Sequence, residues 1–344
     1  MQQMTPAMKT ARGRRRVLAT AAALALILSG CVSGTDDSSG ASSADSAYPV
    51  VAVSSFPLLY VVQQVGGDQV EILNLATASG HAHDMELSPS QVNQLGKADL
   101  ALYLSEGFQP GVETAIQQTG VASLDGFSVL EESQTIAGDP HVWMNPLNIA
   151  TIAQELSTVL NQANPEAGGY YKQNALELTE TMDQIDQEYE AVLAGCRGQT
   201  LLTAHEAFGY LAARYDLDQV GVLGVDPEAE PSPARLRQIM TLIKERDIQF
   251  LFAEPAGAAH DAAEEDHDHD HEGDEQNEAD EADEGAASSG AHVSSGGQKI
   301  ADTLGISALA LDPMEVQTNP NLDVPEVFAL NLASLQEGLE CATR

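Results

Sequence analysis

Positive charge is scarce in this sequence of 344 residues. It has 15 Lys and Arg against 52 Asp and Glu, which gives a formal net charge of -37. Nucleic acids and anionic lipid surfaces select for basic proteins, so this balance argues against both as partners and favours a cation as the ligand. The hydrophobic content of 43% excludes wholesale disorder, and the length is sufficient for two domains with a core in each.

The N-terminal region lacks an apolar run long enough to cross a bilayer. The run from Val17 to Leu28 is too short for a stable span, and five cationic residues with no acid precede it. This pattern predicts an export signal over residues 1–30. The run ends in Leu28-Ser29-Gly30-Cys31, which resembles the lipobox of bacterial lipoproteins. We therefore expect a lipid on Cys31 that anchors the protein on the extracytoplasmic face of the cell membrane, at the cell surface or in the periplasm. A buried free Cys31 is the alternative.

Cysteine is also scarce, with three in the whole chain. With Cys31 assigned to the lipid, Cys196 and Cys341 form an even pair in a protein that folds outside the reducing cytosol. We expect a disulfide between them, which would tie the start of a second lobe to the C-terminal end of the chain. The two lack the short Cys-x-x-Cys spacing of structural zinc sites, which argues against a metal site built from cysteine.

Short β-like runs alternate with helical patterns from residue 48 onward. Before them, residues 31–47 are rich in Ser, Gly, Ala and Asp, which predicts a flexible tether after Cys31. The runs are PVVAVS (49–54), QVEILNL (69–75), DLALYL (99–104), TLLTA (200–204), VGVLG (220–224), IQFLFA (248–253) and ISALAL (306–311). Near-continuous apolar strands separated by helices are typical of parallel sheets covered on both faces. We predict an α/β fold with two lobes, at residues 48–163 and 196–344.

A long helix is predicted between the two groups of strands, over residues 164–195. Asn164-Pro165 is a typical helix start, and Gly195 ends the pattern. The apolar residues between them recur in steps of four and three, which describes one buried stripe on a helix of about 45 Å at 1.5 Å per residue. Such a helix would act as a rigid spine that joins the lobes.

The segment 257–297 interrupts the second lobe and lacks positive charge. It holds 14 Asp or Glu between Asp261 and Glu284, so it is predicted to be a disordered surface loop. Five of the nine histidines lie in it, and His267, His269 and His271 alternate with Asp as in a low-affinity metal tract. Zinc gathering or sensing is one interpretation of this loop, and a solvated acidic insertion is the other.

The four remaining histidines, His81, His83, His141 and His205, form a candidate metal constellation. Five side chains follow closely after the end of a predicted strand: His81, His83, His205, Glu254 and Asp312. Ligands of open parallel sheets bind at the carboxyl ends of the strands, so we expect these residues to converge in a cleft between the lobes. Three imidazoles with one carboxylate or water would complete the tetrahedral shell of Zn²⁺. A lone histidine after a strand is more often a capping residue, so the prediction depends on the joint pattern.

Seven short motifs occur in the order typical of a known family. They are GHAHDMELSPS (80–90), ADL (98–100), DPHVWMNP (139–146), TAHEAFGY (203–210), EPSP (230–233), FAEP (252–255) and LDP (311–313). With these motifs, residues 48–340 resemble the cluster A-I metal-binding proteins of ABC importers, and the ZnuA-like members in particular. The acidic, His-rich insertion of that family commonly lies before the second ligand motif, whereas here it lies between Glu254 and Asp312.

The resemblance implies a set of metal ligands. These are His83, His141 and His205, with Asp312 as the candidate fourth ligand. Manganese-type members commonly carry Glu at the position of His205, so a third imidazole favours Zn²⁺ over Mn²⁺ or Fe²⁺.

Three further residues near the motifs have less direct roles. His81 stands where the family usually has Pro, and it either supports the site or replaces His83 as a ligand. Glu254 is expected to orient a histidine or to meet the partner protein. Trp143, the only Trp, is expected to be a packing anchor for the loop of His141.

The resemblance also implies a function, which is capture of Zn²⁺ and its delivery to an ABC-transporter membrane permease by a lipid-anchored monomer. An enzyme is the first alternative, since three protein ligands with an open position also describe catalytic zinc. However, His205-Glu206 is followed by Ala207-Phe208-Gly209, so the His-Glu-x-x-His motif of zinc proteases is absent. A surface adhesin or zinc buffer without a transporter is the second alternative.

Overall fold

The computed structural model describes residues 48–76, 82–83, 85–227, 229–257 and 292–341. Several sequence predictions fall outside these ranges: the signal 1–30, Cys31 and its tether, His81, and the loop histidines His267, His269 and His271. All the described helices and strands belong to one compact unit. Among them, no helix combines the length and apolar character that a membrane crossing requires.

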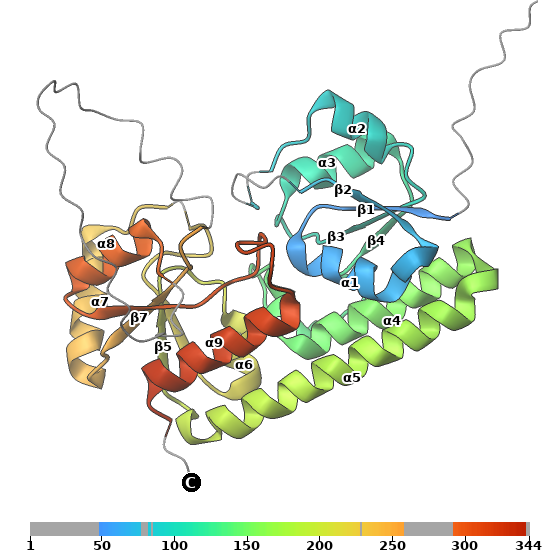
Figure 1. The fold of residues 1–344 in the computed structure, drawn as a ribbon. Coiled ribbons are helices and arrows are strands. Elements are labelled where there is room, and N and C mark those ends of the chain that lie inside the picture. The colour runs from blue at the N-terminus through green and yellow to red at the C-terminus, as the bar shows by residue number, and fades with distance from the viewer. Residues whose placement is uncertain (1–47, 77–81, 84, 228, 258–291, 342–344) are drawn as a thin grey trace, which may run out of the picture. The chain divides into compact units, whose positions relative to one another are not determined.

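The first lobe is built on a four-stranded parallel sheet with strand order β2-β1-β3-β4 (Figure 1). Its strands are β1 (Val50–Val53), β2 (Glu71–Asn74), β3 (Leu100–Tyr103) and β4 (Ser123–Asp125). Its helices are α1 (Phe56–Gly66), α2 (Pro89–Leu95) and α3 (Pro110–Thr119). The central strands β1 and β3 are largely buried, as expected for a sheet covered on both faces. Strand β4 was not predicted, because it contains a single apolar residue, Leu124.

The second lobe repeats this topology with strand order β6-β5-β7-β8. Its strands are β5 (Thr200–Thr203), β6 (Asp218–Gly221), β7 (Phe250–Ala253) and β8 (Ser307–Ala310). Its helices are α6 (Gly209–Tyr215), α7 (Pro233–Arg246), α8 (Ser295–Leu304) and α9 (Val324–Leu339). The predicted class, two α/β lobes with parallel sheets, is confirmed.

Helix α8 corrects the end of the predicted acidic loop. The prediction extended the loop to residue 297, but α8 begins at Ser295. The hydroxyl of Ser294 caps the helix by accepting from the N–H of Gly297, and Val293 forms an antiparallel bridge with Pro255. The folded second lobe therefore resumes before the predicted loop ends.

A pair of long helices joins the lobes. Helix α5 (Gly168–Leu193) is the predicted spine, and its 26 residues span about 39 Å at 1.5 Å per residue. Its buried stripe is Tyr171, Ala175, Leu178, Met182, Ile185 and Tyr189. Helix α4 (Pro146–Ala163), which the sequence pattern did not single out, packs along α5 (Figure 1). Helix α5 also contacts α1 of the first lobe and α6 and α9 of the second.

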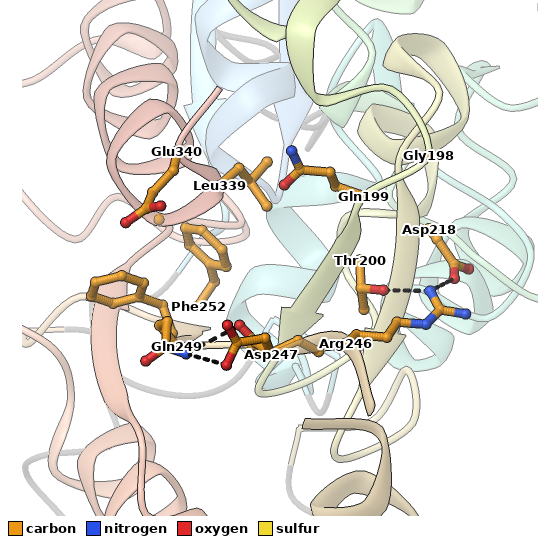
Figure 2. Close-up of a pocket in the computed structure, with 13 residues that line it drawn as sticks. Gly198, Gln199, Thr200, Asp218, Arg246, Asp247, Gln249, Phe252, Leu339 and Glu340 are labelled. Atoms are coloured by element: carbon orange, nitrogen blue, oxygen red, sulfur yellow. Dashed lines mark hydrogen bonds and ion pairs between the residues drawn. The ribbon is translucent and has the colours of Figure 1, made fainter. Parts of the chain in front are cut away.

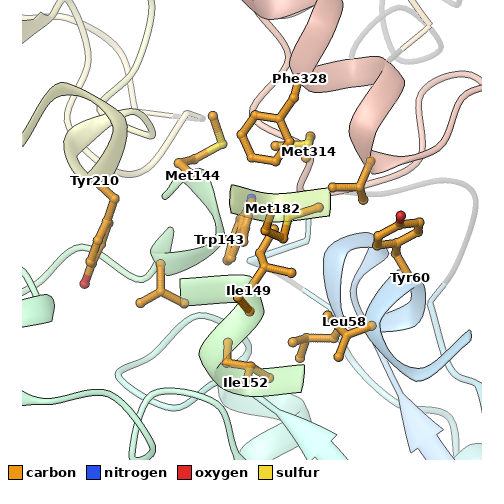
Figure 3. Packing of buried hydrophobic residues seen from close by; sticks show 14 of the residues in the cluster. Leu58, Tyr60, Trp143, Met144, Ile149, Ile152, Met182, Tyr210, Met314 and Phe328 are labelled. Atoms are coloured by element: carbon orange, nitrogen blue, oxygen red, sulfur yellow. The ribbon is translucent and has the colours of Figure 1, made fainter. Parts of the chain in front are cut away.

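One large cluster of buried apolar residues runs through both lobes along these helices, and each lobe has a separate, smaller cluster that includes residues of its own sheet. Val51 of the first sheet and Leu201 of the second both belong to the large cluster. Figure 3 shows its middle part, where Trp143, Met182 and Phe328 lie close together. Separating the lobes would expose this apolar surface to water, so a wide hinge opening is energetically disfavoured.

The predicted disulfide between Cys196 and Cys341 is present, with 5.0 Å between the two Cα atoms. Cys196 lies just beyond the end of α5, and Cys341 lies just beyond the end of α9. The bond therefore fastens α9 to the spine. A sequence separation of 145 residues corresponds to about 5 kcal/mol in the chain-entropy model of cross-linking.

Candidate metal centre

Three imidazoles converge on one carboxylate oxygen. Oε1 of Glu315 lies 3.2 Å from Nε2 of His141 and 3.2 Å from Nε2 of His205. Nε2 of His83 lies 3.6 Å from the same oxygen. Ligand atoms held tetrahedrally at 2.0–2.2 Å from one ion are about 3.3 to 3.6 Å apart, so these three nitrogen-to-oxygen separations fit one shell. Among the described residues, His83, His141 and Glu315 have ligand atoms that all lie within 4.8 Å of one another, whereas His205 contacts Glu315 but is not in that group. His83, His141 and His205, which come from separate parts of the chain, thus meet at one place, together with a carboxylate that was not predicted.

His205 is placed by the register of two neighbouring strands. Thr203 of β5 pairs with Phe252 of β7, so the residues two positions further along lie side by side beyond the carboxyl edge of the sheet. These residues are His205 and Glu254, and Nδ1 of His205 contacts Oε1 of Glu254. A ring that donates its Nδ1 hydrogen to a carboxylate keeps the lone pair of Nε2 for an ion. Glu254 thus has the geometry of the orienting carboxylate that the sequence suggested.

His141 is held by a carboxylate two residues before it. Its Nδ1 lies 2.7 Å from Oδ1 of Asp139, and its backbone N–H donates to the same oxygen at 2.9 Å. The side chain of His141 is completely buried, so water does not compete for these contacts. The pairing again leaves Nε2 as the ligand atom. Asp139 was not singled out from the sequence, although its place two residues before a ligand histidine was an available signal.

His83 lies in the chain between β2 and α2. Its ring packs edge-on against Phe108, with 5.1 Å between the ring centroids, and lies 5.4 Å from the ring of His141. Its Nε2 is buried and has no hydrogen-bond partner among the described residues. A buried nitrogen without a partner is costly, so this atom fits a ligand whose bond to an ion replaces the hydrogen bond.

The structure places Glu315, and not the predicted Asp312, against the imidazoles. Both oxygens of Asp312 are used within its own turn, where Oδ1 accepts from the N–H of Met314 at 2.7 Å and Oδ2 accepts from the hydroxyl of Thr318 at 2.8 Å. Met314 has a φ of 59°, the left-handed conformation, and the chain turns there before Glu315. Asp312 therefore holds the turn that presents Glu315, and Glu315 is the carboxylate that the structure places against all three imidazoles.

The signal for Glu315 was present in the sequence but ambiguous. The stretch Asp312-Pro313-Met314-Glu315 offers two carboxylates three residues apart after a strand. The family resemblance and the position directly after a predicted strand both favour the first, Asp312. An Asp at a turn often hydrogen-bonds the backbone two residues on, as Asp312 does here. This tendency occupies the Asp312 carboxylate and therefore favours Glu315 as the ligand.

Trp143 packs against the centre and ties two of its loops together. Its ring is 1% exposed and lies 5.2 Å from the ring of His141 and 4.9 Å from that of Phe108. Its indole N–H donates to the carbonyl oxygen of Pro313 at 2.7 Å. The predicted packing anchor for the His141 loop therefore also fixes the turn that carries Glu315.

The imidazoles and carboxylates of the centre shift one another's pKa values. Burial lowers the pKa of His205, but the charge and hydrogen bonding of Glu254 and Glu315 outweigh it and raise the pKa to about 10. Burial likewise disfavours the His141 cation, yet Asp139 and Glu315 raise its pKa. Burial opposes ionisation of Glu315, but the imidazoles hold its pKa well below the usual range. The metal-free centre therefore stores protons that a divalent cation must displace.

A cavity of about 600 Å³ lies elsewhere, at the amino-terminal edge of the second sheet (Figure 2). In it the guanidinium of Arg246 contacts Asp218 at 2.5 Å and also the hydroxyl of Thr200. The side chain of Gln249 donates to Asp247. No histidine or cysteine lines this cavity, and its cation already has an acidic partner, so it has no donor set for a transition metal.

Comparison with known proteins identifies relatives by sequence. The family model described as ZnuA, zinc-uptake complex component A periplasmic, matches residues 51–265. The zinc-binding protein AdcA of Streptococcus pyogenes serotype M1 is 26% identical over 232 residues, which are 59% of this chain and 45% of that protein. The high-affinity zinc uptake system protein ZnuA of Bacillus subtilis strain 168 is 27% identical over 252 residues, 68% of this chain and 78% of the relative. The chain thus spans less than half the length of the AdcA relatives it matches.

Comparison with solved structures supports the fold. The Zn(II)-bound ZnuA-like domain of Streptococcus pneumoniae AdcA matches with a TM-score of 0.65 and 21% identity, over 85% of this chain and 99% of that one. The laminin-binding protein Lmb of Streptococcus agalactiae matches with a TM-score of 0.67 and 24% identity, over the same shares. At these identities the likeness concerns the architecture of two lobes and a long helix.

Proposed function

Because this chain belongs to the ZnuA family of zinc-uptake components, we propose that it captures Zn²⁺ outside the cytoplasm and delivers it to an ABC-transporter permease. The names of its relatives, which describe zinc-binding proteins and a zinc uptake system, support this proposal. A lipid on Cys31 would hold the protein, as a monomer, at the membrane surface beside that partner.

One observation carries the proposal: three Nε2 atoms surround a single carboxylate oxygen at 3.2 to 3.6 Å. We propose His83, His141, His205 and Glu315 as the ligands of Zn²⁺. Three nitrogens and one oxygen suit Zn²⁺ better than Mn²⁺, which prefers oxygen. Asp139 and Glu254 keep two of the rings in the tautomer and orientation that binding requires.

Capture in this proposal is an exchange of protons for a metal ion. Glu315 draws protons onto the imidazoles in the metal-free protein, and Zn²⁺ releases them as it takes their place. His83 is the most accessible ligand, with 17% of its side chain exposed, whereas His141 and His205 are buried. The ion would therefore meet His83 first. The continuous core favours small movements of the ligand loops over a wide opening of the lobes.

The same ligand set argues against catalysis. Catalytic zinc sites keep one position open for water or substrate, whereas four protein ligands close a tetrahedral shell. A protein that carries its ion unchanged has no use for an open position. We therefore propose a binding protein and not an enzyme.

The test is titration of metal-free protein with Zn²⁺, Mn²⁺ and Fe²⁺, in parallel with a variant that lacks residues 258–291. This deletion keeps Pro255 and Val293, which pair in an antiparallel bridge on either side of the removed segment, so it leaves the described helices and strands of the second lobe intact. We expect one tight Zn²⁺ site in both proteins and weaker binding of the other metals. Loss of the tight site on deletion would transfer the function to the acidic loop. Unchanged binding after His141→Ala would overturn the proposed ligand set.

Delivery needs a separate test. Deletion of the gene should impair growth in zinc-poor medium, and the wild-type protein should co-purify with a membrane permease. An adhesin or zinc buffer would satisfy neither expectation. Hydrolysis of peptide or ester substrates that disappeared with His205→Ala would instead support the enzyme alternative.

A further inference from the structure

The first turn of α6 lies against the turn that presents Asp139. Residues 136–139 form a tight turn in which the N–H of Asp139 donates to the carbonyl of Ile136 at 3.1 Å. Gly138 adopts a φ of 78°, which a residue with a side chain rarely adopts. This turn comes just before His141, so its shape determines where the Asp139 carboxylate points.

A single hydroxyl closes this turn. The hydroxyl of Tyr210 accepts from the N–H of Ile136 at 2.8 Å and donates to the carbonyl oxygen of Asp139 at 3.1 Å. Both the donor and an acceptor site of the hydroxyl are therefore used, one at each end of the turn. Figure 3 shows the Tyr210 ring extending away from the packed centre of the core, with its oxygen at the far end.

A glycine allows the close approach that these bonds need. A Cβ atom on Gly209 would meet Oδ2 of Asp139 well inside van der Waals contact. The start of α6 therefore touches Asp139 twice, once at its backbone through Tyr210 and once at its carboxylate through Gly209. Both contacts come from consecutive residues of α6, and both act on the residue that holds His141.

Asp139 connects this turn to the proposed metal ligand His141. Asp139 accepts from both the ring Nδ1 and the backbone N–H of His141. Tyr210, Asp139 and His141 are 3%, 6% and 0% exposed, so the whole relay is shielded from water. Tyr210 also lies only five positions after His205, at the start of the helix that follows it. The same short segment therefore bears one ligand and braces the support of another.

We infer that Tyr210 and Gly209 are positioning residues that couple the two buried histidine ligands, with Tyr210 closing the Asp139 turn and Gly209 admitting the helix against it. This inference rests on the proposed function, because it concerns the precision of the same metal site. It adds that a displacement of the His205 segment is transmitted through α6 to the orientation of His141. The two ligands would then engage or release the ion together.

The test compares two tyrosines of the same helix. Tyr210→Phe removes the hydroxyl that closes the turn, whereas Tyr215→Phe removes a hydroxyl that donates to Asp186, away from the ligands. Asp186 keeps both hydrogen bonds from Arg214 in the control. We expect Tyr210→Phe to raise the Kd for Zn²⁺ about 10-fold, the low end of what outer-shell partners usually contribute. Tyr215→Phe should change it less than about twofold. Equal effects of the two substitutions would overturn the inference.

A double-mutant cycle separates positioning from general stability. Asp139→Ala removes the acceptor of His141, so Tyr210→Phe should have no further effect on the Kd for Zn²⁺ in that background. Additive effects would overturn the inference, because they would show that Tyr210 does not act through Asp139. If Tyr210→Phe does not fold, Gly209→Ala replaces it in the same cycle. Alanine favours a helix more than glycine does, so weaker zinc binding there cannot come from a loosened helix.

Failure of the proposed function has a different signature. If wild-type protein binds no Zn²⁺, or if His141→Ala binds it unchanged, the proposed site itself is wrong. If both of those controls behave as expected and Tyr210→Phe still matches Tyr215→Phe, only the coupling is wrong. The measurement in every case is a competition titration against a chelator of known zinc affinity.

Discussion

The two lobes have sheets of the same strand order, yet they supply the metal centre by different means. The second lobe places His205 and Glu254 directly beyond the ends of two paired strands, in a register set by backbone hydrogen bonds. His83 and His141 instead come from longer connections, where side-chain packing and hydrogen bonds to neighbouring side chains hold them. The backbone hydrogen bonds of a sheet fix the positions of neighbouring strands, so the residues that follow those strands are placed precisely. Loop placement depends on a few contacts, so we expect it to be easier to perturb and easier to move.

The largest expected effect is the removal of a buried ligand from the second lobe. Binding of structural zinc is worth about 10 to 16 kcal/mol over four ligands, so His205→Ala should raise the Kd for Zn²⁺ about 100- to 1,000-fold. It also leaves the partly buried Glu254 without the imidazole that it contacts. His83→Ala should weaken binding less, because its side chain is 17% exposed and water can take its place. Competition titration of both variants measures the two Kd values. Equal losses of zinc affinity would show that placement by strand register and placement by a loop do not differ in effect.

The second prediction concerns the two carboxylates that follow β8. Glu315→Gln keeps the shape of the side chain but removes the charge, which is worth about half of a charge-assisted contact. We expect the Kd for Zn²⁺ to rise about 30-fold, which corresponds to about 2 kcal/mol. Asp312→Asn can still accept from the N–H of Met314, so its Kd should change less than about threefold. If Asp312→Asn has the larger effect, Asp312 and not Glu315 is the fourth ligand.

The third prediction is a change in the pH dependence of binding. The pKa of His205 is raised from 6.5 to about 10 by Glu254 and Glu315 against the effect of burial. The charged pair therefore stabilises the metal-free protein fully below pH 6.5 and loses this contribution as pH rises through 10. Zinc needs the neutral ring, so its affinity should rise with pH over the same interval, about tenfold per unit for each proton displaced.

Glu254→Gln tests the source of this dependence. The pKa of His205 should fall, so the affinity between pH 6.5 and 8 should gain less per unit than in the wild type. Glu206→Gln is the matched control, since Glu206 lies next to His205 in sequence but 42% of its side chain is exposed beside Arg235. A change of slope in the control would assign the effect to charge in general and not to the contact with Glu254.

The fold was largely predictable from the sequence, and its exceptions have local causes. Seven of the described strands overlap predicted runs, and the buried stripe of α5 recurs with helical spacing. The run predicted at 220–224 is displaced from its strand, because β6 spans Asp218–Gly221 and begins with two polar residues. Strand β4 is not predicted by the pattern, because Ser123 and Asp125 flank its single apolar residue. Helix α4 was not singled out, although Asn145 caps it and Pro146 begins it. Short polar strands are defined by their neighbours, and the sequence pattern does not contain those neighbours.

The candidate site was predictable where it depends on strand ends and not where it depends on turns. His205 and Glu254 were expected to approach because each follows a strand, and the register brings them into contact. Glu315 was missed because a turn at Met314 in the left-handed conformation decides which carboxylate reaches the imidazoles. Asp139 lies only two residues before His141, so its contact with that ring was predictable, but the turn that orients its carboxylate is closed by Tyr210, 71 positions later in the chain.

The sequence by itself determined the α/β class and the disulfide between Cys196 and Cys341, which follow from periodicity and from a count of cysteines. Residue chemistry narrowed the candidate ligands to four histidines, and the family resemblance of the sequence motifs implied which three of them bind the metal. Only the tertiary structure decided which carboxylate lies against the imidazoles, which residue orients each buried ring, and that the largest apolar cluster runs through both lobes. Those features arise from contacts between residues far apart in the chain, and such contacts exist only after the two sheets and the paired helices have packed together.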